Sequence, residues 1–423
     1  HRSMEKKTVC IIGGGAAGML AAHSAVCAGA SVLLIERNEK LGRKLYITGK
    51  GRCNLTNNCS AAEVLENIPR NAKFLYSAME QFPPEKTMEL FTGLGLKLKT
   101  ERGNRVFPAS DRAADVIDAL FYALRREKVA FHQGRAEALL TQEGHISGVK
   151  LEDGRTLDAS RVILATGGCS YPLTGSTGDG YAMVRAVGHT VVEPQPSLIP
   201  LVEQGSDCAR MQGLSLKNVE VTVRNQRKKV IYQQFGELLF THFGLSGPVI
   251  LSASAHMRNF ERDRYTVSID LKPALDEKKL DERILRDFQE NHNRSFANAL
   301  GALLPRLMIP LVVERSGIPP ETKVHDITKA QRRRLLETIK HFDIPVAGPR
   351  PVEEAIITSG GIKVSEINPS TMESKKCPGL YFAGEVIDVD AYTGGFNLQI
   401  AWATGHLAGV HAASDGKEEE SIS

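Results

Sequence analysis

Long hydrophobic runs are absent from this sequence of 423 residues. No apolar stretch approaches the roughly 18 residues that a membrane-spanning helix needs, and no pattern typical of a signal peptide is visible. An excess of charge is also lacking, because 53 basic and 49 acidic side chains give a formal net charge of only +4. Such a balance does not favour a membrane surface or a nucleic acid as a partner. We therefore expect a cytoplasmic protein without either partner, and the oligomeric state stays open.

Cysteine pairs with the spacing C-x-x-C are absent as well. Seven cysteines are scattered along the chain, an odd number without the regular spacing of a disulfide framework, a zinc site or an iron–sulfur cluster. The pattern therefore predicts no metal centre. It fits a protein of a reducing compartment.

The clearest motif lies near the amino terminus. An apolar run at Val9–Ile12 leads into Gly13, Gly15 and Gly18, which have the spacing G-x-G-x-x-G, and an alanine-rich helical pattern follows directly. This order predicts a strand, a tight turn and a helix. The glycines let the main chain approach a pyrophosphate, whose charge is stabilised by the N–H groups and the positive dipole end of the helix.

An acidic residue stands at the matching distance. A second apolar strand, Ser31–Ile35, ends at Glu36, 18 residues beyond Gly18. A carboxylate there accepts hydrogen bonds from a ribose diol. The site is therefore interpreted as one for an adenine dinucleotide, with FAD and NAD(P) both open at this point.

A second glycine-rich helix start favours FAD. Gly394–Asn397 precedes a helical pattern that runs through Ala412. The N–H groups of Phe396–Gln399 can stabilise the negative charge of a reduced flavin ring through the helix dipole. Glu385, at the end of an apolar strand, is placed to bond the ribityl chain.

A dedicated NAD(P)H domain is not expected. No second complete G-x-G-x-x-G with its strand, helix and acidic residue follows Thr166. A nicotinamide that reduces the flavin must then dock transiently. Thr166 and Gly167 themselves follow the apolar strand Val162–Ala165, at whose carboxyl end a parallel sheet meets its ligand.

The chain divides into segments of different pattern. Residues 4–194 alternate strand and helix patterns, and residues 351–414 resume them, so the nucleotide domain is expected from both ends of the chain. Between them, strands follow from Pro200 to Leu271, helices from Asp276 to Phe342, and a proline-rich link from Pro345 to Pro351. The acidic tail, residues 415–423, is expected to be disordered.

Four stretches carry a resemblance to a known family. They are GRKLYITGKGRCNLTN (Gly42–Asn57), GELLFTHFGLSGP (Gly236–Pro248), TSGGI (Thr358–Ile362) and FAGEVIDVDAYTGGFNLQIAWATG (Phe382–Gly405). The sequence resembles the bacterial NAD(P)/FAD-dependent oxidoreductase family that includes aminoacetone oxidase and a flavoprotein of bile-acid dehydroxylation. The resemblance implies an α/β fold, with a glutathione-reductase-type FAD-binding Rossmann domain, an inserted β-barrel domain (195–274) and a small helical subdomain (275–350).

The resemblance also assigns cofactor-binding residues. It places the pyrophosphate on Gly13, Gly15, Ala16, Ala17 and Gly18, the adenosine ribose on Glu36 and Arg37, and the adenine against Ala136. It places Arg43, Lys44, Gly51, Arg52, Cys53 and Asn54 along the ribityl chain and the flavin. Thr166 and Gly167 lie at the strand end, and Gly384, Glu385, Asp388, Gly395, Phe396, Asn397, Leu398 and Gln399 lie at the isoalloxazine end.

Catalytic side chains are not identified, because the flavin N5 itself carries the hydride. The two candidates are His242 as an acid–base group and Tyr392 as a cover for the flavin face, with a structural histidine and simple packing as alternatives. Cys53 is interpreted as a structural thiol, because it has no nearby C-x-x-C partner. The basic runs Arg227–Lys229 and Arg332–Arg334 are interpreted as solvated faces.

Three functional hypotheses follow. The leading one is an FAD-dependent oxidoreductase that exchanges a hydride between flavin N5 and a small organic substrate, by amine or amino-ketone oxidation or by enone reduction. Oxygen or transient NAD(P)H is the redox partner. The second is an RNA-modifying flavoprotein, motivated by the two basic runs, and the third is a flavin-binding protein without turnover.

Overall fold

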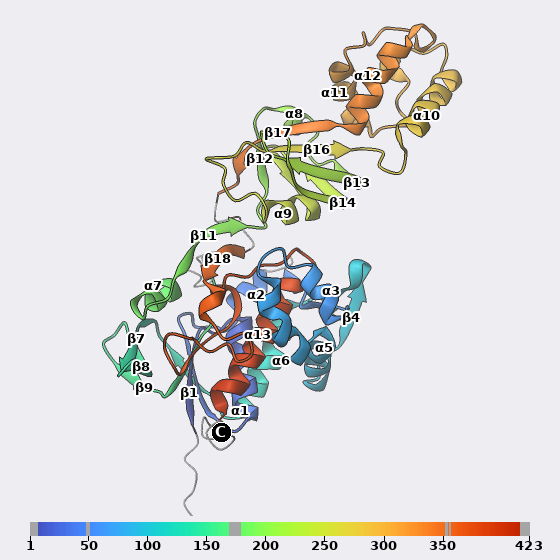
Figure 1. The fold of residues 1–423 in the computed structure, drawn as a ribbon. Helices are drawn as coiled ribbons and strands as arrows, with labels where there is room; N and C mark the ends of the chain where they lie inside the picture. Colours follow the sequence, from blue (N-terminus) through green and yellow to red (C-terminus); the bar gives the residue numbers. More distant parts are fainter. Residues whose placement is uncertain (1–6, 48–50, 169–178, 352–353, 355–356, 415–423) are drawn as a thin grey trace, which may run out of the picture. The chain divides into compact units, whose positions relative to one another are not determined.

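The computed structural model describes residues 7–47, 51–168, 179–351, 354 and 357–414 (Figure 1). The chain forms two compact units, one of His1–Ser197 with Glu353–Ser423 and one of Leu198–Val352. The acidic tail, for which we expected disorder, lies outside the described residues. So do residues 169–178, which include most of a glycine-rich segment that follows Gly167.

A five-stranded parallel sheet forms the centre of the first unit. Its strand order is β19-β10-β1-β2-β6, and all neighbouring strands are parallel. The strands are β1 (Thr8–Ile12), β2 (Ser31–Glu36), β6 (Ala130–Gln133), β10 (Arg161–Leu164) and β19 (Leu380–Phe382). Since β19 comes from the far end of the sequence, both ends of the chain build this sheet.

Two long helices pack on each other beside the sheet. In Figure 1, α13 (Phe396–Ala413) lies beside α1 (Ala16–Cys27). Neither helix has a strongly amphipathic pattern, because each is buried on more than one side. Their main chains approach closely, since a Cβ at Gly405 would lie 2.5 Å from the carbonyl oxygen of Ala17.

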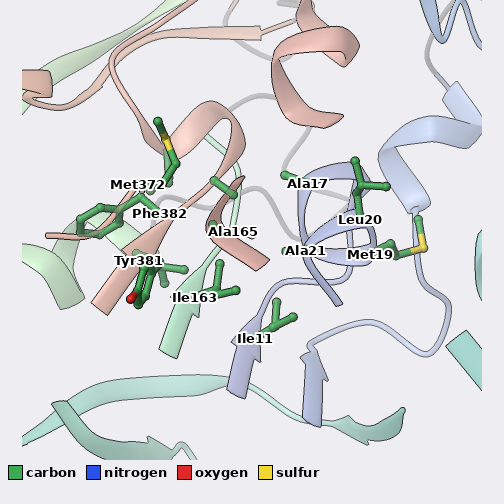
Figure 2. Packing of buried hydrophobic residues seen from close by; sticks show 14 of the residues in the cluster. Ile11, Ala17, Met19, Leu20, Ala21, Ile163, Ala165, Met372, Tyr381 and Phe382 are labelled. Carbon is green, nitrogen blue, oxygen red and sulfur yellow. The ribbon is translucent and has the colours of Figure 1, made fainter. Parts of the chain in front are cut away.

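The core of the first unit lies between these helices and the sheet. Figure 2 shows Ile11, Ile163 and Phe382 from three neighbouring strands, with Ala17 and Leu20 of α1 packed nearby. Ile11, Ile163, Phe382 and Leu20 have no exposed surface. These strands are buried on both faces, which explains their continuous apolar runs in the sequence.

Smaller elements surround the Rossmann core. They are α2 (Arg43–Ile47), β3 (Thr56–Asn57), α3 (Ala61–Glu66), α4 (Tyr76–Gln81), α5 (Pro84–Gly93), β4 (Leu98–Glu101), β5 (Arg105–Pro108), α6 (Ala113–Arg126), β7 (Ala136–Gln142), β8 (His145–Leu151), β9 (Thr156–Asp158), α7 (Asp179–Ala186), β11 (Val191–Ser197) and β18 (Ile357–Ile362). The strands form three small sheets, β3-β5-β4, β7-β8-β9 and β11-β18.

The second unit contains a closed six-stranded barrel of order β12-β15-β14-β13-β16-β17. The strands are β12 (Leu201–Glu203), β13 (Ser215–Arg224), β14 (Val230–Phe240), β15 (Gly244–Ser246), β16 (Thr266–Asp270) and β17 (Phe342–Pro349). The Rossmann domain and the barrel together confirm the expected α/β fold class.

Helices follow β16 and precede β17. They are α10 (Glu277–Glu290), α11 (Ile309–Ser316) and α12 (Lys329–Lys340). A capping box begins α12, because the Thr328 side chain accepts the Gln331 N–H while the Gln331 side chain accepts the Thr328 N–H. Leu335, Leu336 and Ile339 of α12 are buried.

Two expectations for this unit are wrong. Pro345–Pro351 is not simply a link, because Phe342–Pro349 is a barrel strand within the segment expected to be helical. The buried residues Phe342, Ile344 and Val346 alternate with exposed residues, which is the pattern of a strand. This alternation predicts the strand better than the prolines predict a link. The segment expected to be all strands also contains two short helices, α8 (Asp207–Arg210) and α9 (Pro248–Ser254).

None of the helices in the described parts of the chain has the length and apolar character needed to cross a membrane.

Candidate cofactor cleft

The G-x-G-x-x-G turn joins β1 to α1, and its three glycines have different surroundings. Gly13 has a φ of +110°, and a Cβ there would lie 2.3 Å from the carbonyl oxygen of Ala165. A Cβ at Gly18 would lie 1.7 Å from the carbonyl oxygen of Gly13. A Cβ at Gly15 would meet no atom within 4 Å. Gly13 and Gly18 are therefore required by packing, whereas Gly15 borders open space.

That open space is a cleft at the carboxyl ends of β1, β10 and β19. It is lined by Gly13, Gly14, Gly15, Ala16, Ala17, Glu36, Gly42, Arg43, Lys44, Leu45, Ala165, Thr166, Gly167, Ala383, Gly384, Glu385, Asn397, Leu398 and Ala401. These residues come from both ends of the sequence. The amino-terminal ends of α1 and α13 thus both border the cleft.

The chemistry of the cleft fits a dinucleotide that carries negative charge. Neither α1, with Gly15 as N-cap, nor α13, with Gly395 as N-cap, has a side-chain cap or an acidic residue in its first turn. Their positive dipole ends are therefore left for an anion. Among the described residues, the buried hydroxyl oxygen of Thr166 in the cleft wall has no hydrogen-bond partner.

Glu36 lies at the end of β2, where the ribose was expected. Its carboxylate accepts the N–H groups of Gly14 and Asn38, each at 3.2 Å. Burial raises the pKa of Glu36, and these backbone hydrogen bonds oppose that shift. Each carboxylate oxygen keeps a second lone pair for a ribose hydroxyl.

A smaller pocket adjoins Glu36. Its lining is Ile12, Gly13, Ile35, Glu36, Arg37, Gly134, Arg135, Ala136, Thr166 and Met183. The pocket brings Arg37 and Ala136, which were expected at the adenosine, together with the end of β1. Gly134, Arg135 and Met183 were not among the expected residues, because no sequence motif marks them.

An ion pair crosses the other part of the cleft. Lys44 Nζ donates to both carboxylate oxygens of Glu385, at 2.8 and 2.7 Å, and Gly168 donates its N–H to Glu385 at 3.3 Å. Both residues were expected near the ribityl chain and flavin, but their pairing was not foreseen. Their side chains are 24% and 21% exposed, so water screens the pair only partly.

Several expected residues lie outside the lining and support it. The Gln399 amide is fully buried, where its oxygen accepts the hydroxyls of Thr56 and Thr87 at 2.8 and 2.7 Å and its nitrogen donates to Phe82. The Asn54 side chain accepts the Gly395 N–H at 2.9 Å. These two amides fix the first turn of α13.

The loop before α13 is held in the same way. Asn397 pairs with both main-chain groups of Ala391, at 2.8 and 2.9 Å. The buried carboxylate of Asp388 forms a two-pronged ion pair with Arg70, at 3.0 and 3.1 Å. Asp388 therefore anchors the loop, and Phe396 is buried as the first residue of the helix.

The segment that contains Gly51, Arg52 and Cys53 is built differently from the expectation. Arg52 lies over the Phe107 ring and donates to Glu101 and Asp111 at 2.7 and 2.8 Å, away from the cleft lining. Cys53 is fully buried with a φ of +61°, and burial raises the pKa of its thiol to about 12. A protonated, enclosed thiol agrees with a structural role.

The two catalytic candidates belong to different units of the chain. His242 is exposed on the barrel, where its ring contacts Phe243 edge-on. Tyr392 is half-buried in the first unit, and burial followed by the charge of Asp390 raises the pKa of its hydroxyl. Within the described residues, no group of three or more His, Cys, Asp or Glu residues is arranged to hold a metal ion.

Comparison with known proteins gives the family of this chain. Residues 7–411 match the model of the HI0933-like protein Rossmann domain. The chain belongs to the HI0933-like family. It is an FAD-dependent oxidoreductase with a Rossmann domain.

Curated relatives of this HI0933-like chain extend over almost its whole length. It is 33% identical over 409 residues to a 3-dehydro-bile acid delta(4,6)-reductase of Clostridium scindens, covering 95% of this chain and 98% of the relative. It is 31% identical over 403 residues to a ribosomal RNA dihydrouridine synthase of Escherichia coli, covering 95% and 96%. The expectation of no nucleic-acid partner is therefore unresolved.

Solved structures share the fold of this HI0933-like protein. The 3-ketosteroid-delta4-(5alpha)-dehydrogenase of Rhodococcus jostii superposes with a TM-score of 0.54 at 15% identity, covering 98% of this chain and 99% of that one. The 3-ketosteroid delta1-dehydrogenase of Sterolibacterium denitrificans gives 0.51 at 14%, covering 96% and 100%. At these identities the similarity concerns the fold alone.

Proposed function

We propose that this protein reduces a carbon–carbon double bond conjugated to a carbonyl group. The names of two relatives support this reaction class, because a delta(4,6)-reductase saturates ring double bonds and a dihydrouridine synthase saturates the uracil ring. The observation that carries the proposal is the open start of α13 at the cleft, whose dipole favours negative charge. When bound and reduced by NAD(P)H, FAD would supply a hydride from N5, and a proton would complete the saturation of the double bond.

The chain's own residues bind and orient the cofactor in this proposal. Gly13–Ala17 hold the pyrophosphate against α1, and Glu36 holds the ribose. Lys44 and Glu385 face the chain between the ribose and the flavin. The first turn of α13 would hold the flavin ring, and NAD(P)H would dock only transiently as reductant, because the sequence offers a single dinucleotide motif.

RNA uracil is the second candidate substrate. It is supported by relatives named ribosomal RNA dihydrouridine synthase in two bacteria, Escherichia coli and Haemophilus influenzae, at 31% and 30% identity. A uracil ring and a steroid dienone share a double bond conjugated to a carbonyl group. The same cleft chemistry therefore serves either substrate, and contacts outside the cleft choose between them.

An anaerobic spectrophotometric titration tests the proposal. The FAD-loaded protein is titrated with NADH and then NADPH while the absorption of oxidised flavin is followed. A conjugated steroid dienone or a uridine-containing RNA is then added to the reduced protein. We expect bleaching by one nucleotide and return of the absorption on addition of one acceptor.

Two results would contradict the proposal. Bleaching by an amine or amino ketone, without bleaching by either nicotinamide, would indicate an oxidase. Reoxidation by oxygen alone, with no saturated product from any conjugated acceptor, would also exclude the reductase. Product analysis by mass spectrometry distinguishes these outcomes, because saturation adds two hydrogen atoms.

A further inference from the structure

Two loops of the barrel unit gather positive charge at one end of the barrel. The β13–β14 turn with its flank, residues 224–229, and the loop before β16, residues 258–264, contain seven basic residues and two acidic ones. Their net charge of +5 exceeds the +4 of the whole chain. The remainder of the protein is therefore close to neutral, and the positive charge is local rather than diffuse.

Hydrogen bonds join the two loops into one surface. Gln226 donates from its amide nitrogen to Asp263 at 3.2 Å, and its amide oxygen accepts the Arg264 N–H at 3.0 Å. Asn225 holds the turn by accepting the N–H groups of Arg227 and Lys229 at 3.0 and 3.1 Å. The charges therefore sit on ordered backbone rather than on independent loops.

Five cations of this surface are exposed and have no ion pair with a described residue. They are Arg227, Lys228, Lys229, Arg262 and Arg264. One acidic residue of the surface, Asp263, accepts the Gln226 amide and the Tyr265 hydroxyl, and the other, Glu261, is exposed. The five cations keep their full charge for an external partner.

The other basic run of the sequence behaves differently. On α12, Arg332 pairs with Asp281 at 2.6 Å, and Arg333 pairs with Glu277 and Glu337 at 2.9 and 2.7 Å. Carboxylates of the same unit thus pair with two of the three arginines of that run. A basic run in the sequence therefore does not by itself leave its cations unpaired. At the barrel end, the five cations are unpaired because no carboxylate lies within ion-pair distance of them in the described part of the chain.

We propose that this barrel-end surface, residues 224–229 and 258–264, binds the phosphate backbone of RNA. Unpaired arginine and lysine side chains on a firm surface suit phosphate oxygens, and the binding energy comes mainly from counterion release. Insertion into a lipid surface would need several apolar side chains, whereas the two loops contain only Phe260, whose ring packs edge-on against Tyr265. Val230, 45% exposed, adjoins them.

Strand register places the basic surface at one end of the barrel. Arg224 of β13 lies opposite Thr266, the first residue of β16, in the strand register. Helix α10 follows the other end of β16. Leu201 pairs with Pro349 where the chain enters and leaves this unit. The basic surface thus lies at the end of the barrel opposite to α10 and α12. The claim that the bound RNA is the substrate rests on the proposed function. The claim that this surface binds RNA does not depend on it.

Fluorescence anisotropy with a labelled, uridine-containing RNA hairpin tests the binding. The FAD-loaded protein is titrated at several KCl concentrations. The test variant is Arg227→Gln/Lys228→Asn/Lys229→Gln, in which asparagine suits the positive φ of 63° at Lys228. The matched control, Lys278→Gln/Lys279→Gln/Lys329→Gln, removes three exposed cations from the helices of the same unit.

We expect the affinity of the test variant to fall by roughly 100-fold at about 0.1 M salt, and the salt slope by about 2, if each lost cation contacts one phosphate. The control should bind like the parent protein. Equal losses in both variants would overturn the proposal, because binding would then follow net charge alone. Absence of RNA retention at low salt would also overturn it, as would capture by phosphatidylserine vesicles without RNA binding.

Two further measurements keep the outcomes separate. Thermal unfolding of both variants shows whether the barrel is intact, and a binding loss in a folded variant is the supporting result. Dienone reduction on the same samples tests the proposed reaction independently. Dienone reduction without RNA binding would support the proposed reductase and overturn the RNA-binding inference. RNA binding without reduction of any acceptor would support the RNA-binding inference and overturn the proposed reductase.

Discussion

Lys44 Nζ donates to both carboxylate oxygens of Glu385, at 2.8 and 2.7 Å, across 341 residues of sequence. The pair joins the segment after β2 to the segment after β19, and both residues line the cleft. It therefore couples the two chain ends at the place where we expect the cofactor.

Breaking this ion pair should weaken FAD binding. Lys44→Met leaves a partly buried carboxylate unpaired beside the cofactor, and Glu385→Gln removes the charge that orients the lysine. We expect each change to raise the Kd for FAD about tenfold, measured by flavin fluorescence on the deflavinated protein. Lys150→Met, which breaks the exposed pair with Glu137, is the control. An unchanged Kd in both cleft variants would show that the pair does not support the cofactor.

The glycine turn predicts that one substitution should weaken FAD binding and another should lower the stability of the protein. Gly15→Ala places a methyl group in open space, so the unfolding temperature without FAD should stay the same while FAD affinity falls at least tenfold. Gly18→Ala drives a methyl group into the Gly13 carbonyl, so it should destabilise the cofactor-free protein by about 1 to 3 kcal/mol. Thermal unfolding with and without FAD distinguishes them. Similar behaviour of the two variants would contradict this division of roles.

The contact between α1 and α13 predicts a strong size limit. A Cβ at Gly405 would lie 2.5 Å from the Ala17 oxygen, and one at Gly409 would lie 2.4 Å from the Ala21 oxygen. Either Gly→Ala change should cost about 1 to 3 kcal/mol of unfolding free energy despite the better helix propensity of alanine. Gly93→Ala in α5, with no atom within 4 Å of the new methyl, should be neutral or stabilising. Urea unfolding provides the values, and equal effects at all three sites would refute close helix packing.

Acid sensitivity is expected from His406. Its ring stacks on Phe82 at 4.6 Å and contacts Ser24, and burial, with the positive charges of Lys86, His23 and His411, lowers its pKa to about 4. The unfolded chain has the ordinary pKa near 6.5 and so binds more protons between these values. Stability should therefore be complete above pH 6.5 and fall as the pH approaches 4.

A substitution isolates this contribution. Between neutral pH and about pH 5, the parent protein should lose about 1 kcal/mol more unfolding free energy than His406→Gln, after allowance for solvent screening of a partly exposed ring. Urea unfolding at the two pH values measures the difference. A parallel loss in both proteins would assign the acid sensitivity to other groups, such as His189, whose pKa burial also lowers.

Local patterns in the sequence determined the nucleotide fold. Strand, glycine turn, helix and Glu36 follow one another within 36 residues, and their geometry depends on near neighbours and on the absence of a Cβ at Gly13 and Gly18. The capping box at Thr328 was predictable for the same reason. Interactions over short chain distances leave a readable signature.

Only the tertiary structure decided which side chains meet. The pairing of Lys44 with Glu385, the buried bonds of Gln399 and the ion pairs of Arg52 join residues that are 49 to 343 positions apart, so no local pattern records them. The near-zero net charge of the sequence argued against a nucleic-acid partner. Net charge, however, does not show where the individual charges lie on the folded protein. Folding places unpaired cations of two loops on one end of the barrel while it neutralises Arg332 and Arg333 on α12. Composition is fixed by the sequence, but the field that a partner meets depends on which charges the fold leaves unpaired.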